Sequence, residues 1–269
     1  MENINTYKQL KKYESKYSNI RNIIKSIFIK NSNSEKFFHQ SEYIIFPFWH
    51  HVFDDEIESF TSQIKFMKNY GDFISYDDAI NLLKMGLKTN DKYFCLSFDD
   101  GFKNIYENVT DILLKFNAPC VFFIPTSFID NRRDDSGQVF FNNNKLKINF
   151  LNWKDCKQIS TNQIFEFGSH SVNHKIFTKL SHDECYFEIE ESKKIIETNL
   201  EIKCKHFAPP VGIFSQERDL DLVKKLKYKS LSTTVRGKME NKFFDEYLIK
   251  RHHLLAGWEI SYLKYFFAK

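Results

Sequence analysis

Glycine and proline are scarce in this sequence, with 8 and 5 among 269 residues, so each one helps to mark a boundary between elements. Long apolar runs are absent. The longest uncharged run near the start covers 43–53, against about 20 apolar residues for a membrane-spanning helix, and no apolar run follows a basic start as in a signal peptide. We therefore expect a soluble protein without a cleaved leader.

Paired cysteines and a strong excess of charge are also lacking. The five cysteines are at least 19 residues apart, which leaves no Cys-x-x-Cys pair, and indicates free thiols in a reducing, cytoplasmic compartment. A net charge of +4 is too small for a dedicated nucleic-acid binder, so we expect no nucleic acid as partner. At 42% apolar and 17% aromatic residues, the sequence can build a sizeable core, which excludes disordered and fibrous classes.

The basic residues are concentrated at the start of the chain, where residues 1–36 contain eight Lys or Arg and three Glu. A polar Asn-Ser-Asn-Ser linker follows at 31–34. We expect residues 1–40 to form a basic helical extension and linker, and residues 41–269 one domain. If residues 7–30 form an amphipathic helix, they provide peripheral contact with anionic lipid at the inner face of the membrane, weakened by salt.

Apolar or β-branched runs alternate with helical patterns along the rest of the chain. Helices are predicted over 103–116, 76–85 and 182–200, the last two from capping-box spacing at Ser75 and Ser181. A long polar loop is predicted over 126–150. Strands alternating with helices predict a parallel α/β sheet, open or closed into a barrel; the seven runs are 43–48, 92–98, 119–125, 164–169, 204–208, 229–234 and 247–250.

Titratable residues follow several of these strands, at the end where parallel α/β barrels place their chemistry. Asp99 and Asp100 end one strand, and both reach one site only if the chain turns there, which Gly101 permits. The alternative for one of them is the N-cap of the next helix. His170 and His174 follow another strand at a spacing that lets two imidazoles bind one cation, although surface histidines show this spacing by chance. Two histidines and an aspartate leave room for water in a zinc-type site.

The sequence resembles the polysaccharide deacetylase (NodB-homology) family, carbohydrate esterase family four. The resemblance rests on three motifs in order, Phe98–Gly101, Gly168–His174 and Phe207–Gly212, and covers about Tyr43 to Tyr265. It implies a distorted barrel of about seven β/α units, with residues 1–40 as an N-terminal extension. It also implies a divalent metal, most often zinc, and removal of an acetyl group from an N-acetylated sugar.

Site roles follow from the same resemblance. It makes Asp100, His170 and His174 the metal ligands and Asp99 the general base for a metal-bound water. A backbone N–H at Val211, after two prolines without one, would stabilise the oxyanion, although Pro-Pro-x-Gly is equally a rigid turn. His50 is the first candidate for the general acid and His252 the second.

Two further assignments are hypotheses. Many family members have an Arg where this chain has Ala208, and we expect Arg251 to approach Asp99 from across the barrel and supply that charge. Trp49, Trp153 and Pro210 are candidates for contact with a sugar, with core packing as the alternative for the two tryptophans.

Three functions remain in competition. The first is N-deacetylation of an amino sugar in a glycan, a glycolipid precursor or a nucleotide sugar. The second keeps fold and metal but cleaves another C–N bond, in a formyl amide or a cyclic imide. The third is a catalytically silent sugar-binding module. The motifs fix neither the sugar nor the oligomeric state.

Overall fold

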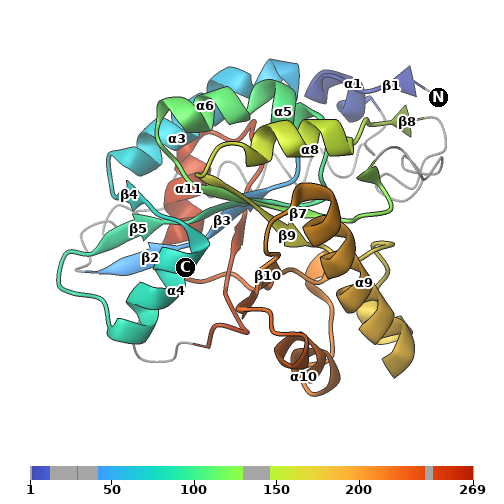
Figure 1. The fold of residues 1–269 in the computed structure, drawn as a ribbon. Coiled ribbons are helices and arrows are strands. Elements are labelled where there is room, and N and C mark those ends of the chain that lie inside the picture. The colour runs from blue at the N-terminus through green and yellow to red at the C-terminus, as the bar shows by residue number, and fades with distance from the viewer. Residues whose placement is uncertain (1, 13–28, 30–41, 130–145, 240–244, 269) are drawn as a thin grey trace.

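The computed structural model describes residues 2–12, 29, 42–129, 146–239 and 245–268. A seven-stranded sheet, all of whose pairings are parallel, forms its centre (Figure 1). The strands lie in the order β11 (Ser230–Leu231), β10 (His206–Phe207), β9 (Phe165–Ser169), β7 (Cys120–Ile124), β6 (Leu96–Phe98), β3 (Pro47–Trp49) and β12 (His252–His253).

Two smaller sheets extend this centre. The first contains β2 (Tyr43–Ile45), β5 (Lys92–Phe94) and β4 (Asp72–Phe73), and the second pairs β1 (Glu2–Asn3) with β8 (Leu146–Lys147). The two edges of the central sheet approach one another, because Ser232, just after β11, forms a parallel bridge with Ile249, shortly before β12. The fold is therefore the distorted α/β barrel that the sequence predicted.

Most helices cover the outer face of the sheet (Figure 1), whereas α4 (Tyr76–Met85) packs against its inner face. The other helices are α1 (Tyr7–Lys11), α3 (Ile57–Lys68), α5 (Asn104–Asn108), α6 (Thr110–Lys115), α8 (Trp153–Ser160), α9 (His182–Leu200), α10 (Arg218–Lys225) and α11 (Ile260–Phe267). Short 3-10 turns lie at η2 (Asp54–Glu56), η4 (Phe177–Lys179) and η5 (Pro210–Gly212).

Alternation along the strands divides the core into two parts. On β7, Phe122 points into the larger core under the outer helices, whereas Val121 and Phe123 point into a smaller core with Tyr76 and Ile80 of α4. Successive strand residues point to opposite faces, so each strand contributes to both cores. The same alternation decides which residues beyond a strand reach the pocket.

Several local predictions are confirmed and others are wrong. The helices at 76–85 and 182–200 have the predicted bounds, with Ser75 and Ser181 accepting from backbone N–H groups as N-caps. The helix predicted over 103–116 is split into α5 and α6 at Val109. Part of the loop predicted over 126–150 is β8 together with buried apolar residues, and 130–145 lies outside the described residues.

The last strand lies later than predicted. The run 247–250 contains the bridge residue Ile249, and the strand itself is His252–His253, which pairs with Pro47 and Phe48 of β3. The backbone oxygen of Asp245 accepts a hydrogen bond from the backbone N–H of Leu248, and its carboxylate accepts one from the backbone N–H of Tyr247. These bonds form a turn, so the strand begins later. Arg251 consequently lies inside the barrel, with no exposed surface, instead of beyond a strand end.

The start of the chain packs against the domain. Parallel pairing of β1 with β8 places Ile4 in a small apolar cluster with Phe53 and Phe102. Asp55 accepts hydrogen bonds from the first backbone N–H groups of α1. Most of the predicted extension at 1–40, and of the lipid-contact segment at 7–30, lies outside the described residues.

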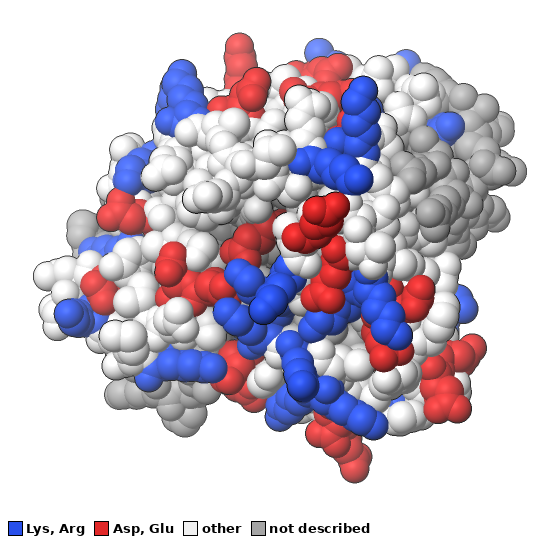
Figure 2. All heavy atoms as spheres, viewed as in Figure 1, with Lys and Arg blue, Asp and Glu red and all other residues white. Residues whose placement is uncertain are grey.

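None of the helices in the described ranges combines the length and the apolar character that crossing a bilayer requires. All five cysteines are buried free thiols, as the spacing predicted. Acidic and basic side chains are interspersed on the face shown in Figure 2, with basic groups gathered in its lower half.

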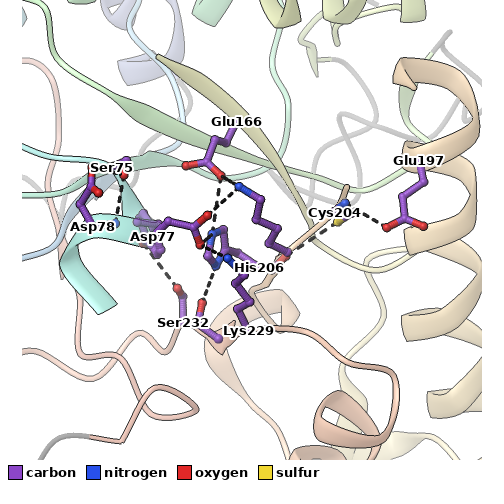
Figure 3. A network of polar contacts seen from close by, with 12 residues as sticks. Ser75, Asp77, Asp78, Glu166, Glu197, Cys204, His206, Lys229 and Ser232 are labelled. Carbon is purple, nitrogen blue, oxygen red and sulfur yellow. Dashed lines mark hydrogen bonds and ion pairs between the residues drawn. The ribbon is translucent and has the colours of Figure 1, made fainter. Parts of the chain in front are cut away.

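A partly buried ion-pair network lies at the amino ends of β9 and β10. Figure 3 shows Asp77 and Glu166 converging on His206. Lys205 Nζ lies 2.6 Å from Asp77 Oδ2 and 3.3 Å from Glu166 Oε2, and Lys229 Nζ is 2.9 Å from Asp77 Oδ1. Burial by itself raises the pKa of Asp77 and of Glu166, but the neighbouring cations outweigh it and lower both. The network ties α4 to the inner face of the sheet.

We expect Lys205→Met to lower the free energy of unfolding at pH 7 by about 1–3 kcal/mol, because two partly buried carboxylates lose a charged partner. Carboxyl groups with lowered pKa stabilise the fold above their unfolded pKa, and this stabilisation is lost as pH falls through the folded pKa. The deficit of the variant should therefore shrink as pH falls below about 4. Urea unfolding at several pH values measures it, with exposed Lys203→Met as control. A deficit that does not change with pH would contradict the ion-pair origin.

Candidate active site

A tight turn after β6 brings two aspartates into one pocket. Asp99 donates its backbone N–H to Trp49 O (2.9 Å), and Asp100 and Gly101 have φ values of +73° and +69°. This left-handed pair turns the chain so that both carboxylates, nearly fully buried, line the same cavity. Neither caps the following helix, because the N-cap position of α5 is Lys103.

The two histidines after β9 meet Asp100. His170 Nε2 lies 3.4 Å and His174 Nε2 3.2 Å from Asp100 Oδ1. One ligand atom from each of the three side chains lies within 4.8 Å of the others. Asp100 thus meets two histidines that lie 70 and 74 positions later in the sequence, as predicted.

The donor set fits a divalent cation of the zinc class. Asp100 Oδ1 is buried and accepts no hydrogen bond, which is costly for a carboxylate unless a cation occupies the site. His170 Nδ1 lies 2.6 Å from Ala208 O, so that a proton on Nδ1 leaves the Nε2 lone pair facing Asp100. Burial by itself raises the pKa of Asp100, but His50, His170 and His174 hold it well below its usual range. The carboxylate of Asp100 is thus kept ionised.

Arg251 reaches Asp99 from across the barrel, as predicted. Arg251 Nη1 and Nη2 donate to the two carboxylate oxygens at 2.8 Å each, and Nε donates to Thr233 O at 2.9 Å. The guanidinium also lies over the Phe48 ring, 4.1 Å from its centroid. Burial raises the pKa of Asp99, yet Arg251 and His170 outweigh this and lower it. Asp99 is therefore an anion held in a fixed orientation.

His50 follows β3 and lines the same pocket. Its Nε2 lies 3.8 Å from Asp100 Oδ2, and its Nδ1 lies 3.0 Å from His253 Nε2. Burial lowers the pKa of His50, and the nearby carboxylates of Asp100 and Asp99, which raise it, offset only part of this effect. The placement favours His50 over His252 as a proton donor, because His252 lies on the opposite face of β12 and packs against Phe267.

The turn at η5 forms another wall. Val211 has φ +55°, a strained value for a β-branched residue, and its side chain is 55% exposed. Gly212 has φ +69°, and a Cβ there would lie 2.0 Å from Thr234 Oγ1, so glycine is required. Strain is commonly found at functional sites. Val211 lines the pocket, and the oxyanion role of its N–H stays a prediction.

The pocket has a volume of about 500 Å³ and opens to solvent. It contains the metal-ligand candidates, Asp99 and several neighbours, namely Phe48, His50, His51, Phe102, Val211, Gly212, Thr234 and His253.

Three predicted substrate contacts do not line this pocket. Trp49 is fully buried on the outer face of β3, where its ring stacks on Phe98 and its Nε1 donates to Gln63. Trp153 starts α8 and is buried in the outer core. Pro210 is buried, while its neighbours Val211 and Gly212 form the wall. The alternative, core packing, is correct for both tryptophans because strand alternation and the helix start turn them outward.

Sequence reasoning left His253 without a role, although it lines the pocket and contacts His50. The available signal was the two-residue spacing from Arg251, which places both residues on one face of an extended chain. Thr234 carried no comparable signal, because it follows β11 and reaches the pocket beside Gly212, which belongs to another turn.

Comparison with known proteins agrees with this fold. The family model for polysaccharide deacetylase matches residues 86–231, more than half of the chain. The chain therefore belongs to the polysaccharide deacetylase family.

Individual relatives and solved structures are similar to this chain in sequence or in fold. A poly-beta-1,6-N-acetyl-D-glucosamine N-deacetylase of Staphylococcus aureus is 26% identical over 219 residues, which cover 74% of this chain and 70% of the relative. IcaB from Ammonifex degensii has a similar fold, with TM-score 0.67 and 16% identity over 80% of this chain and 93% of that one. The Streptococcus pyogenes deacetylase PplD, solved in complex with acetate, gives TM-score 0.64 and 21% identity over 84% and 97%.

Proposed function

We propose that the protein is a metal-dependent N-deacetylase that removes the acetyl group from an N-acetylated amino sugar of a glycan. The observation that carries the proposal is the meeting of Asp100, His170 and His174, with the ionised Asp99 beside them, in one open pocket. The similarity to an enzyme named for poly-N-acetylglucosamine supports a glycan of N-acetylglucosamine as the substrate class.

Asp100, His170 and His174 would hold the divalent cation, most often zinc in sites of this kind. Bound there, the cation would lower the pKa of a water molecule and polarise the amide carbonyl. The oxygen and nitrogen donors suit zinc and related first-row metals.

Asp99 supplies the base. It lies next to the ligand set but is itself bound to Arg251, so it is free of the ligand role and fixed in orientation. In this proposal Asp99 takes the proton of the attacking water. Arg251 keeps the carboxylate ionised in a buried setting, where it would otherwise tend to be protonated.

Two other groups complete the reaction. The backbone N–H of Val211 would donate to the oxygen on which negative charge develops, and strain at this residue fits a fixed orientation. His50 would protonate the amine as it leaves. The pocket volume of about 500 Å³ lies within the range of roughly 300–1,000 Å³ found for small-ligand sites, and its open side lets a glycan chain continue into solvent.

The test measures metal binding and product together. Purified protein should bind one equivalent of zinc or cobalt by calorimetry and release acetate from N-acetylglucosamine oligosaccharides. Asp100→Ala should lose both, whereas Asp183→Ala, which removes an exposed carboxylate at the start of α9, should lose neither.

Other outcomes would overturn the proposal. Wild-type protein that binds none of these metals would remove its basis. Release of formate, or opening of a cyclic imide, without release of acetate would identify the other C–N hydrolase. Oligosaccharide binding without product would identify a sugar-binding module.

A further inference from the structure

We propose that His253 is a positioning residue that holds the imidazole of His50 with its Nε2 toward Asp100 and the pocket. The inference rests on the proposed function, in which His50 protonates the leaving amine, and it assigns a role to a histidine outside the motifs.

The two rings form a direct pair. His50 follows β3 and His253 ends β12, neighbouring parallel strands in which His253 is in register with Phe48. His50 Nδ1 lies 3.0 Å from His253 Nε2, and the ring planes are nearly perpendicular, at 86° with centroids 4.7 Å apart. This edge-on approach directs one nitrogen of each ring at the other, as a hydrogen bond requires.

His253 is itself held in place. Its ring packs on Phe48 with centroids 5.0 Å apart, and its backbone oxygen accepts from Arg236 Nη2 at 2.8 Å. Burial, together with His50 and Arg236, lowers the pKa of His253 to about 3. The ring is therefore neutral at ordinary pH, with one nitrogen able to donate and the other able to accept.

The direction of the hydrogen bond follows from the role of His50. To pass a proton from Nε2 to an amine, His50 must carry protons on both nitrogens just before transfer. Its Nδ1–H then needs an acceptor, and His253 Nε2 is at hydrogen-bond distance. His253 therefore keeps its own proton on Nδ1. After transfer, the amine has gained the Nε2 proton and His50 is neutral, with its Nδ1–H still hydrogen-bonded to His253 Nε2.

Packing alone would not need a nitrogen at this place. A phenylalanine would fill the same space against Phe48 but accept no hydrogen bond, and His50 would then be free to rotate. A glutamine has an amide oxygen that can accept near the position of Nε2. The two substitutions therefore separate the space that His253 fills from the hydrogen bond that it accepts.

The experiment compares His253→Phe and His253→Gln on two substrates with metal-loaded protein. On an N-acetylglucosamine oligosaccharide, we expect kcat of His253→Phe to fall by about 10²-fold or more with KM little changed, because general-acid catalysis contributes about 10²–10⁴-fold. An aryl acetate should be cleaved at nearly the wild-type rate, because a phenolate leaves without a proton. His253→Gln should recover most of the lost amide turnover.

Three results would overturn the inference: wild-type amide turnover in His253→Phe, equal loss on both substrates, or a glutamine variant no better than phenylalanine. Failure of the proposed function looks different, since wild-type protein would then release no acetate. Nitrogen-15 NMR of the wild-type histidines decides the inference in that case too. A proton on His50 Nδ1 supports it, and a bare Nδ1 contradicts it.

Discussion

Asp99→Asn should reduce kcat for acetate release by about 10²–10⁴-fold while metal binding is unchanged. The substitution removes the carboxylate to which we assign the proton of the attacking water, and it keeps the size and shape of the side chain. None of the three ligand candidates is altered, because Asp99 binds Arg251 instead. Steady-state kinetics and calorimetric metal titration on the same preparation measure both effects.

Asp100→Asn provides the matched control, since it changes a carboxylate at the adjacent position in the same turn. It should lose most of its metal affinity, because Asp100 faces both histidines. The two variants should therefore separate, one failing in turnover and the other in binding. Near wild-type turnover in Asp99→Asn would assign the proton transfer to another group.

The separation arises from environment and not from residue type. Asp99 meets a guanidinium inside the barrel, and Asp100 meets the histidine side chains at its mouth. The left-handed φ of Asp100 directs the two carboxylates to different partners within one pocket. Adjacent identical residues therefore have different partners, as the proposed roles of base and ligand require.

Much of this site was predictable because its residues lie just beyond strand ends. An apolar strand that ends in Asp99 and Asp100, and another that ends in His170, meet at one edge of any parallel sheet. The helices at 76–85 and 182–200 were predictable because a capping serine and a following acidic residue act locally. Such features depend on short stretches of chain.

The side of the sheet to which each individual side chain points was less predictable. Trp49 and His50 are neighbours, yet one lies in the outer core and the other in the pocket. A strand that lies later than its predicted run, as His252–His253 does after 247–250, moves a residue from a strand end into the barrel interior. Such register depends on pairing with β3, from another part of the chain, and not on local pattern.

The position of β12 buries Arg251 inside the barrel, and this burial affects the stability of the fold. Its guanidinium has no exposed surface and binds Asp99 through two hydrogen bonds. We expect Arg251→Met to lower the free energy of unfolding by about 3–5 kcal/mol, because an unpaired carboxylate would remain buried. Turnover should fall as well, because the base would lose its orientation and its charge partner. Urea unfolding and steady-state kinetics measure the two effects.

Arg251→Lys is the first control, since an ammonium keeps the charge but cannot form the paired hydrogen bonds. It should retain more stability than the methionine variant and recover only part of the turnover. The double variant Asp99→Asn with Arg251→Met is the second control. Without a buried carboxylate, methionine should cost much less stability than in the single variant, so the two changes should be non-additive. Additive losses would show that Arg251 stabilises the barrel through Thr233 and the aromatic rings, independently of Asp99.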